Sequence, residues 1–470
     1  MSLGLFVFKR KVKLGDKGTM SRISKLFKVD FLQGPIIRSL IIFAIPLFIS
    51  SIFQQMYSMV DTMIVGNYLG DQALAAMGAC ASISDLIVGF CLGVGNGMAV
   101  VTARSFGAGN EKQVKKSVAM TLVLGALVTG VITGLGSLIL RPLLELLNTP
   151  AEIIDQSYSY VSMIMAGALV TLAYNLCAGM LRAIGNSVMP LLFLIVASVL
   201  NVVLDIVFIS NFHMGIRGAA VATVISQGIS ALLCVIYIWK KAPVLVPSKE
   251  HFSFDKGLCS ELLGQGISMG LMGSIVSLGT VVLQYGINGF GTLIIAGHTA
   301  ARKLHFVCMM FSITLSMACS TFVSQNKGAG NRERIIRAMK YMFVFDFASG
   351  AVVTVLLYFF ARPVVQLITG STELVVLDNA TRYLLVAGPF YAILGVLLQT
   401  RSALQGIGEK VLPIISSVIE MVGKVIFTLV FIPMFGYTAV IWCEPLIWCA
   451  MTAQLLFSYY RNPFIRGVEK

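Results

Sequence analysis

Two aspartates near the ends of separate apolar stretches are the residues of this sequence best suited to chemistry. Asp61 follows Tyr57 by four positions, and Asp205 follows Asn201 by four positions. Residues four apart share one face of a helix, so each carboxyl group has a polar neighbour one turn away. A carboxyl group in a low-dielectric interior beside a second one can hold a proton or, with other oxygen atoms, a sodium ion. The four residues predict an ion-coupling site.

The elements that must position these residues are membrane-spanning helices. Of the 470 residues, 57% are hydrophobic and only 12% are charged, whereas a soluble protein carries about a quarter charged residues. The apolar runs approach the ~20 residues that cross a bilayer as a helix, and the alternating strands of a membrane barrel are not seen. We predict an all-α polytopic membrane protein. Its twelve expected spans are 39–66, 73–103, 117–140, 157–181, 188–210, 218–239, 262–287, 293–323, 339–361, 382–400, 411–432 and 436–460.

The basic residues predict how these spans are oriented. With the amino terminus inside, 28 of the 35 Lys and Arg residues fall in inside segments and only four fall in outside loops. This is the bias of the positive-inside rule, so we expect a multi-pass protein of the cell membrane with both termini cytoplasmic. The net charge of +14 therefore sets topology, and no nucleic-acid partner is expected. Residues 1–19 are expected to form a disordered extension, and Met20 could be the true start.

Enzymatic chemistry has no support in the sequence. The nine cysteines include no CxxC pair, and the four histidines have no metal-ligand spacing. No HExxH motif is present, and GISMG at 266–270, which fits GxSxG, lies inside an apolar span rather than at a strand-to-helix turn. We expect no catalytic residues, no bound metal and no cofactor other than the coupling ion, H⁺ or Na⁺.

An internal repeat divides the chain into two halves. The segment FGAGNEKQVKK at 106–116 matches KGAGNRERIIR at 327–337 with an offset of 221, and LRAIGNSVMP at 181–190 matches LQGIGEKVLP at 404–413 with an offset of 223. Six spans per half make the repeat parallel, as in many secondary transporters. The GAGN glycines are interpreted as tight cytoplasmic turns. The expected units are a tail at 1–38, a first six-helix lobe at 39–240, a linker at 241–261, a second six-helix lobe at 262–460 and a tail at 461–470.

The repeat also shows which polar residues are peculiar to one lobe. Asp61 aligns with Val282, and Asp205 aligns with Thr428, so the second half lacks both acids. It has instead Glu420 and Lys424, which are four residues apart and can neutralise one another. The first lobe thus holds the unpaired acids and the expected ion site. The alternative for each acid is contact with outer headgroups or a backbone donor.

Two further residues of the first lobe could contribute. Asp85 shares a helix face with small residues at 81, 89 and 93, which predicts packing inside the bundle. It could extend the ion site or be a satisfied buried group. Pro46 removes a backbone hydrogen bond from the first span, so it marks either a weak point that responds to ion binding or a static kink.

The charged residues of the second lobe leave several alternatives open. Arg302 lies in the eighth span with His298, Lys303 and His305. These side chains could face a cavity or pair with one another, and Glu444 in the last span has the same two alternatives. Near the cytoplasmic boundary, Asp346 and Arg401 are expected to extend toward the membrane surface.

Several motifs resemble the multidrug and toxic compound extrusion (MATE) family, and bacterial members in particular. The resemblance covers residues 30–460. The motifs are FAIPLFISSIFQQMYSMVDTMIVGNYLGDQALAAMGA (43–79), FGAGN, LRAIGNSVMP, LNVVLDIVFI and GIRGAAVATVIS (215–226).

The resemblance implies two six-helix lobes around a V-shaped cavity and export of compounds in exchange for protons or sodium ions. It also implies that Asp61 is the coupling acid, that Asn201 and Asp205 are its partners, and that the first helix bends at Pro46. The segment 266–286 of the seventh span lacks the acid that some relatives carry there. This absence speaks against a second sodium site of that type and favours protons.

The expected function is therefore ion-coupled antiport of cationic or amphipathic drugs by alternating access. The expected partners are these small molecules and the lipid bilayer, with the chain acting as a monomer. The alternative within the wider superfamily is a lipid-linked saccharide flippase, which would carry a more basic, headgroup-sized cavity. A membrane-embedded enzyme is less well supported, because the sequence shows no set of catalytic residues on facing helices. A channel is less well supported, because the two-lobe duplication is typical of transporters.

Overall fold

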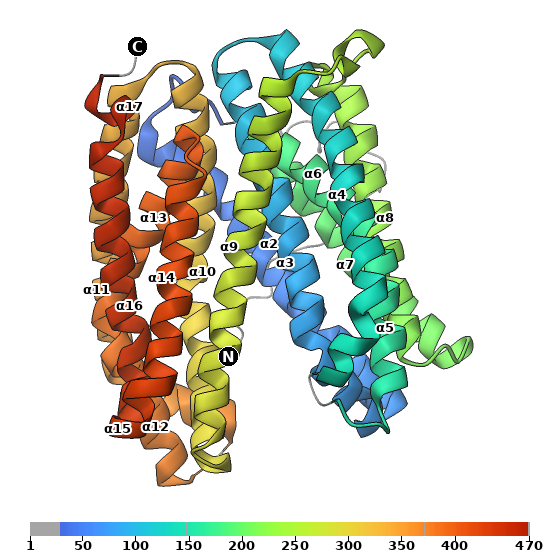
Figure 1. The fold of residues 1–470 in the computed structure, drawn as a ribbon, viewed down its shortest axis with the longest axis vertical. Coiled ribbons are helices and arrows are strands. Elements are labelled where there is room, and N and C mark those ends of the chain that lie inside the picture. The colour runs from blue at the N-terminus through green and yellow to red at the C-terminus, as the bar shows by residue number, and fades with distance from the viewer. Residues whose placement is uncertain (1–28, 147–148, 371, 469–470) are drawn as a thin grey trace, which may run out of the picture.

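The computed structural model describes residues 29–146, 149–370 and 372–468, and every regular element in these ranges is a helix. The extension expected at 1–19 lies outside the described residues, as does most of the tail expected at 1–38. Figure 1 shows the helices arranged as two side-by-side bundles that run the full height of the molecule.

The first lobe is built from long apolar helices and one bent pair. The pair α5 and α6 meets at Gly167 with an angle of 44°, and the two together have the length and composition of one span. Helix α7 continues into a π-helical turn at Val207–Asn211. The helices of this lobe are α2 (Ile36–Leu69), α3 (Asp71–Gly107), α4 (Glu111–Leu146), α5 (Ile154–Ala166), α6 (Ala168–Ala183), α7 (Val188–Ile206) and α8 (Ile216–Lys241).

The second lobe repeats this order. A short 3-10 turn at Gly388–Phe390 joins α12 to α13, and a π-helical turn at Phe427–Phe431 follows α14, at the place that matches the π-helical turn of the first lobe. The helices are α9 (Lys256–Asn288), α10 (Thr292–Gly328), α11 (Arg332–Thr369), α12 (Leu374–Ala387), α13 (Tyr391–Ile407), α14 (Val411–Ile426), α15 (Ile432–Phe435), α16 (Tyr437–Arg461) and α17 (Pro463–Arg466).

The prediction of twelve spans is confirmed when the bent pair is counted as one. The described residues contain 11 helices, or helix runs, long and apolar enough to cross a membrane, and the pair α5–α6 makes up to 12. The connection between the lobes holds two short 3-10 turns, Pro243–Leu245 and Lys249–Phe252. Helix α9 begins at Lys256, so its first turns lie within the segment expected as linker.

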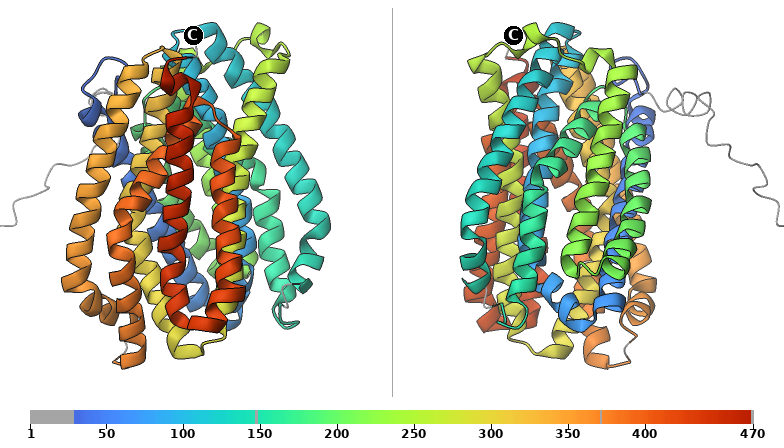
Figure 2. Two further views of the ribbon diagram at one scale, coloured as in Figure 1. Left: turned by 60° about the vertical axis from the view of Figure 1, so that its left-hand side comes forward. Right: turned by 90° about the vertical axis from the view of Figure 1, so that its right-hand side faces the viewer.

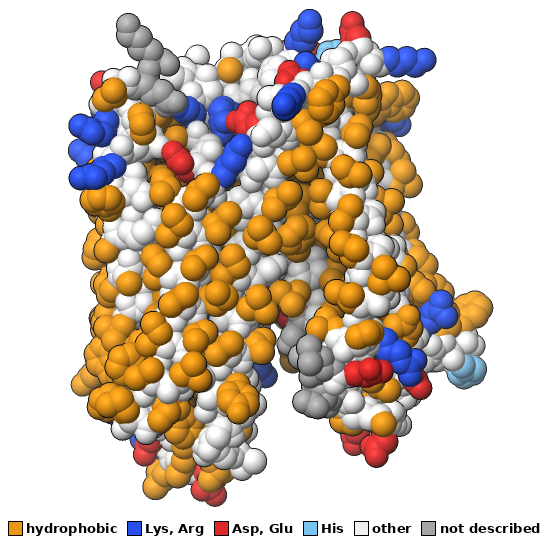
Figure 3. Space-filling view, in the orientation of Figure 1, with side chains coloured by type: hydrophobic (Ala, Val, Ile, Leu, Met, Phe, Trp, Pro, Cys, Tyr) orange, Lys and Arg blue, Asp and Glu red, His pale blue; other side chains and the backbone are white. Residues whose placement is uncertain are grey.

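Four helices form the seam between the lobes. Helices α2 and α3 of the first lobe lie against α9 and α10 of the second, and α3 and α9 make the most extensive of these contacts. Figure 1 shows α9 between the two bundles, and Figure 2 shows the outer side of each bundle. We call the end of the molecule that carries 104–116, 240–256 and 327–337 the basic end, and the opposite end the far end. Lys and Arg side chains gather at the basic end in Figure 3, and a hollow between the lobes opens at the far end.

Glycine allows the lobes to close at the basic end. A Cβ at Gly107 would lie 1.9 Å from the Gln325 carbonyl oxygen, and a Cβ at Gly328 would lie 1.9 Å from the Arg104 carbonyl oxygen. Gly107 and Gly328 are the first glycines of the two GAGN motifs, and they let α3 and α10 cross backbone to backbone. The turns that the motif predicts are formed by Gly109 and Gly330, which have φ of +69° and +71°.

The lobes separate along one face of α3, and this corrects the expectation for Asp85. A Cβ at Gly93 would lie 2.6 Å from the Met269 carbonyl oxygen of α9, whereas Gly89, one turn nearer the far end, has nothing within 4 Å. Asp85 continues this face by one more turn and is exposed. The prediction that Asp85 packs inside the bundle is therefore wrong, because α9 has already diverged at its level.

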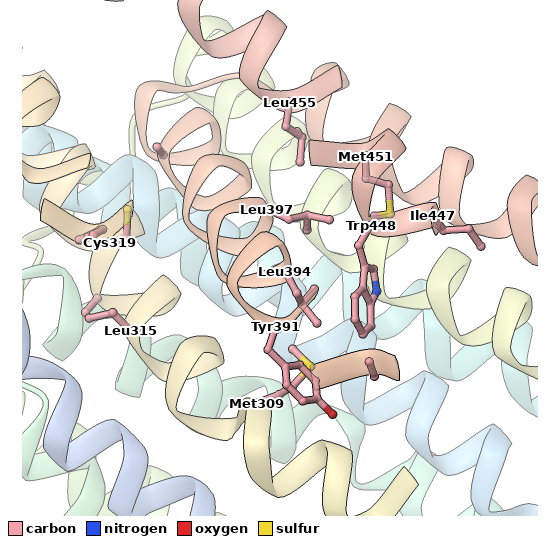
Figure 4. Close-up of a cluster of buried hydrophobic side chains, with 14 of the residues drawn as sticks. Met309, Leu315, Cys319, Tyr391, Leu394, Leu397, Ile447, Trp448, Met451 and Leu455 are labelled. Carbon is pink, nitrogen blue, oxygen red and sulfur yellow. The ribbon is translucent and has the colours of Figure 1, made fainter. Parts of the chain in front are cut away.

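A continuous core lies mainly in the second lobe and extends onto α2 of the first lobe. Apolar side chains from α10, α13 and α16 interdigitate, with Leu397 and Met451 each about 1% exposed. Figure 4 shows Tyr391 and Trp448 packed at one end of this cluster and Leu455 at the other.

Candidate ion-binding site

The acids predicted to couple ions are brought together inside the first lobe. Helix α2 carries Asp61 and packs along α7, which carries Asp205 just before its π-helical turn. Asp61 is 6% exposed and Asp205 is fully buried. Both helices run from the basic end to the far end, which is why two acids late in separate spans reach one depth.

The two carboxyl groups lie close enough for the charge of each to act on the other. Asn201 Nδ2 lies 3.5 Å from Asp205 Oδ1 and 3.4 Å from Thr223 Oγ1 of α8. Three oxygens remain without a donor among the described residues: Asp61 Oδ1, Asp205 Oδ2 and Asn201 Oδ1. The pocket thus offers acceptors in excess of donors.

This excess of acceptors defines what the site can do. Two neighbouring carboxyl groups in a buried site cannot both stay negatively charged without a proton or a cation, because their like charges repel and neither is solvated. Within the described part of the chain, neither Asp61 nor Asp205 forms an ion pair with a Lys or Arg side chain. A proton, or a cation that takes oxygen ligands, is therefore the group that can satisfy the pair.

Three residues around the acids were missed from the sequence. Tyr160 of α5 lies close enough to both carboxyl groups to interact with their charge, and Gln227 of α8 lines the same cavity as Tyr57. Thr223 supports Asn201 from the same face of α8 as Gln227. The repeat held one signal, since Tyr160 aligns with Tyr383, which contacts the charged residues of the second lobe.

A cavity of about 180 Å³ lies next to the acid pair. Tyr57 and Asn201 form part of its wall, so a molecule in the cavity would touch the same residues that surround the acids. No charged side chain lines it among the described residues. Its lining is Gln54, Tyr57, Val88, Leu92, Thr171, Tyr174, Asn175, Leu194, Ala197, Ser198, Asn201, Thr223, Ser226, Gln227 and Ser230.

The second lobe has a charge cluster in place of unpaired acids. Lys424 Nζ lies 2.9 Å from Glu420 Oε1 and 3.9 Å from Glu444 Oε1. Arg302 Nη1 lies 2.6 Å from Glu444 Oε1, and the Tyr383 hydroxyl donates to Glu444 Oε2 at 2.7 Å. The two positive and two negative side chains of this cluster sum to zero charge. Arg302 pairs with Glu444, and the expected ion pair between Glu420 and Lys424 is formed.

The histidines of α10 and the proline of α2 lie within long helices. His298 and His305 contact the hydroxyl groups of Tyr437 and Tyr391 at 3.1 and 3.0 Å. Helix α2 runs without interruption through Pro46, which is buried.

Two residues expected to reach the membrane surface lie inside the protein. Asp346 is 1% exposed and packs against Gly395, because α11 crosses α13 at that glycine. Arg401 of α13 lines a cavity between the lobes with Arg182. The predictions for Asp346 and Arg401 are therefore wrong, since both helices turn these side chains toward neighbouring helices.

Comparison with known proteins gives one consistent result. The family model described as MatE matches residues 46–207 and 269–430, one match in each half. The chain is 28% identical to the probable multidrug resistance protein YpnP of Bacillus subtilis over 78% of this chain and 82% of that protein. It is 26% identical to an FAD transporter of Shewanella oneidensis over 79% of this chain and 83% of that protein. Its fold matches the crystal structure of a MATE protein in the bent conformation, with a TM-score of 0.86, 22% identity and coverage of 93% and 97% of the two chains.

Proposed function

Because this chain belongs to the MATE family of transporters, we propose that it exchanges a cation, H⁺ or Na⁺, for cationic or amphipathic organic compounds and exports these compounds. The observation that carries the proposal is the buried pair of Asp61 and Asp205. Their unpartnered oxygens need a proton or a cation, and their polar neighbours Tyr57 and Asn201 also line a cavity.

The coupling follows from competition for one group of residues. When a cation occupies the acid pair, the carboxyl oxygens need no further hydrogen-bond donors. When the pair is empty, its negative charge attracts hydrogen-bond donors or a positively charged cargo to the region of Asn201 and Tyr57. Differential affinity of the two occupants for the two conformations is what drives alternating access. The continuous helix α2, with Pro46 one hydrogen bond short, is the element whose packing would respond.

The orientation belongs to the same proposal. The basic end would face the cytoplasm under the positive-inside rule, with both termini on that side of the cell membrane. The hollow at the far end would then face outward, and the crossing of α3 and α10 would seal the inner side. The chain would act as a monomer, since each lobe finds its partner within the same chain.

The second candidate function is transport of lipid-linked saccharides. The observation that favours it is a cavity between the lobes to which Arg182 and Arg401 contribute, since a flippase of this kind requires a basic cavity. The acid pair in the first lobe favours antiport instead, because an antiporter requires an ion-binding group.

Transport by the purified protein in proteoliposomes tests the proposal. Asp61→Asn should abolish cation-driven efflux of a fluorescent cationic drug while the protein still elutes as a folded species in size-exclusion chromatography. Imposing the proton gradient and the sodium gradient separately identifies the ion. Asp71→Asn, at an exposed acid at the start of α3, is the matched control. Undiminished efflux by the Asp61→Asn protein would exclude the pair as the coupling site.

A further inference from the structure

A second cavity lies between the lobes, on the basic side of the hollow. It has a volume of about 210 Å³ and is bordered by α3 and α6 of the first lobe and by α9, α10 and α13 of the second. The acid pair and its cavity lie in the first lobe and share none of these lining residues. The lining is Asn96, Ala99, Val100, Gly179, Arg182, Ala183, Met269, Met272, Ser316, Met317, Ser320, Thr321, Leu398, Arg401, Ser402 and Gln405.

The charged residues of this lining are both arginines, one from each lobe. Arg182 lies near the end of α6 and donates to Asn96 Oδ1 at 3.0 Å. Arg401 lies in α13, and its buried Nε and Nη2 have no partner among the described residues. No carboxylate is part of the lining. Two guanidinium groups therefore border one cavity whose lining contains no counter-ion.

The surrounding charges do not neutralise the pair. The acid that acts on Arg401 is Glu420, which is already bound to Lys424 at 2.9 Å. Glu261, near the basic end, is bound to Arg104. A buried guanidinium group without a carboxylate is costly, because its five donors lose their water and gain nothing in return. The positive charge at this cavity is thus available to a ligand.

The donors present define the chemistry of that ligand. A guanidinium group presents a planar fork of N–H donors that matches a carboxylate or a phosphate. Hydroxyl groups on the α10 side of the lining supply further donors, and Ser320 Oγ is buried without a partner. Met269, Met272 and Met317 give the remaining wall an adaptable apolar surface.

We propose that this cavity binds the acidic group, a phosphate or a carboxylate, of an amphipathic compound, with Arg182 and Arg401 as the residues that recognise it. The inference rests on the proposed transport function, and it adds an acidic group to the expected cargo. Because each arginine belongs to a different lobe, the acidic group holds the lobes together at the basic end. Release would then accompany their separation.

Equilibrium binding to the full-length protein in a neutral detergent tests the proposal without any ion gradient. Calorimetric titration compares 1-naphthyl phosphate with 1-naphthol, which differ only in the phosphate. The wild-type protein should bind the phosphate at least roughly tenfold more tightly, as expected for hydrogen bonds to a charged group. Arg401→Gln should remove this preference and leave the affinity for 1-naphthol unchanged. Arg217→Gln, at an exposed arginine at the far end, should change neither affinity.

Additional variants and ligands keep the test decisive. Arg401→Lys retains the charge but loses the fork, so it should recover part of the preference; it also replaces the Gln variant if that protein does not fold. Dihexanoyl phosphatidic acid tests a lipid source for the same group, and Arg401-dependent binding of this lipid with none of 1-naphthyl phosphate would assign the site to headgroups. Equal affinities for the two naphthyl compounds, with no Arg401-dependent lipid binding, would overturn the proposal. Asp61→Asn should bind 1-naphthyl phosphate normally, so loss of coupling and loss of this site are told apart.

Discussion

Lys424 occupies in the second lobe the position that Asn201 occupies in the first. The repeat offset of 223 aligns the two, and alignment of the helices that follow Gly215 and Gly436 places Thr223 over Glu444. The aligned pairs are close in both lobes, at 3.4 Å for Asn201 and Thr223 and 3.9 Å for Lys424 and Glu444. The second lobe therefore has the positively charged side chain of Lys424 at the position where the first lobe has the neutral Asn201, beside acids that form no ion pair.

Lys424→Met should destabilise the protein strongly. The substitution leaves Glu420 without a cation and removes one of the two cations beside the buried Glu444. Removal of one partner from a buried ion pair costs about 3–5 kcal/mol. The measurement is the midpoint of thermal unfolding in detergent, which should fall by several degrees.

Glu420→Gln combined with Lys424→Met is the matched control. It removes both members of the closest pair, so it should recover most of the lost stability. If the single variant unfolds at the wild-type temperature, the charge cluster contributes nothing to the stability of the second lobe.

Asn201→Ala should reduce coupled transport about tenfold or more, because a hydrogen bond to a charged group contributes about 1.5–3 kcal/mol. The variant removes the donor to Asp205 Oδ1 without changing any charge. Efflux rates in proteoliposomes measure the effect. Thr223→Ala, which loses only the contact to Asn201, should have a smaller effect, and the reverse order of the two variants would contradict this assignment.

Gly107→Ala should prevent closure at the basic end. The added methyl group would lie 1.9 Å from the Gln325 carbonyl oxygen, so α3 and α10 must move apart. Hydrogen exchange of the peptides that contain 101–108 and 321–330 should become faster. Gly134→Ala in α4, where nothing lies within 4 Å, should leave exchange unchanged. Unaltered protection in the Gly107 variant would show that the crossing tolerates a side chain.

Asp255 should make the start of α9 sensitive to acid. Its side chain accepts hydrogen bonds from Lys116 Nζ at 2.9 Å and from the Leu258 amide at 3.1 Å, and these contacts, that of Lys116 first, lower the pKa of Asp255. A lowered pKa in the folded state stabilises the protein above the ordinary pKa of about 4, and this contribution is lost as the pH falls through the lowered value. Asp255→Asn retains a helix cap, so its thermal midpoint should fall less than that of the wild type between about pH 5 and about pH 3. Equal losses would assign no role to the ion pair.

Much of the fold and part of the candidate site could be predicted because both depend on local patterns. Apolar runs and the GAGN repeat determine the spans and their order. The i to i+4 spacing places Tyr57 with Asp61 and Asn201 with Asp205 whatever the tertiary structure. The first and fifth spans cross the membrane in the same direction, so the two pairs could be predicted to lie at a similar depth.

The residues that were missed depend on contacts between distant helices. Arg182 looks in the sequence like one more basic residue of an inside segment, and Arg401 looks like a side chain that reaches the membrane surface. Only the arrangement of α6 and α13 in the folded chain brings both arginines to one cavity. Asp85 was misplaced for a related reason, since no local pattern shows where α3 and α9 part.

The crossing of Gly107 and Gly328 bears on the origin of the chain. Gly107 lies against the carbonyl of Gln325, and Gly328 lies against the carbonyl of Arg104. The repeat offset of 221 relates the two glycines to each other and likewise relates Arg104 to Gln325. Such a reciprocal seam is what two identical six-helix polypeptides would form about a two-fold axis. Fusion of an ancestral homodimer would thus have preserved the seam, while each moiety became free to acquire different charges.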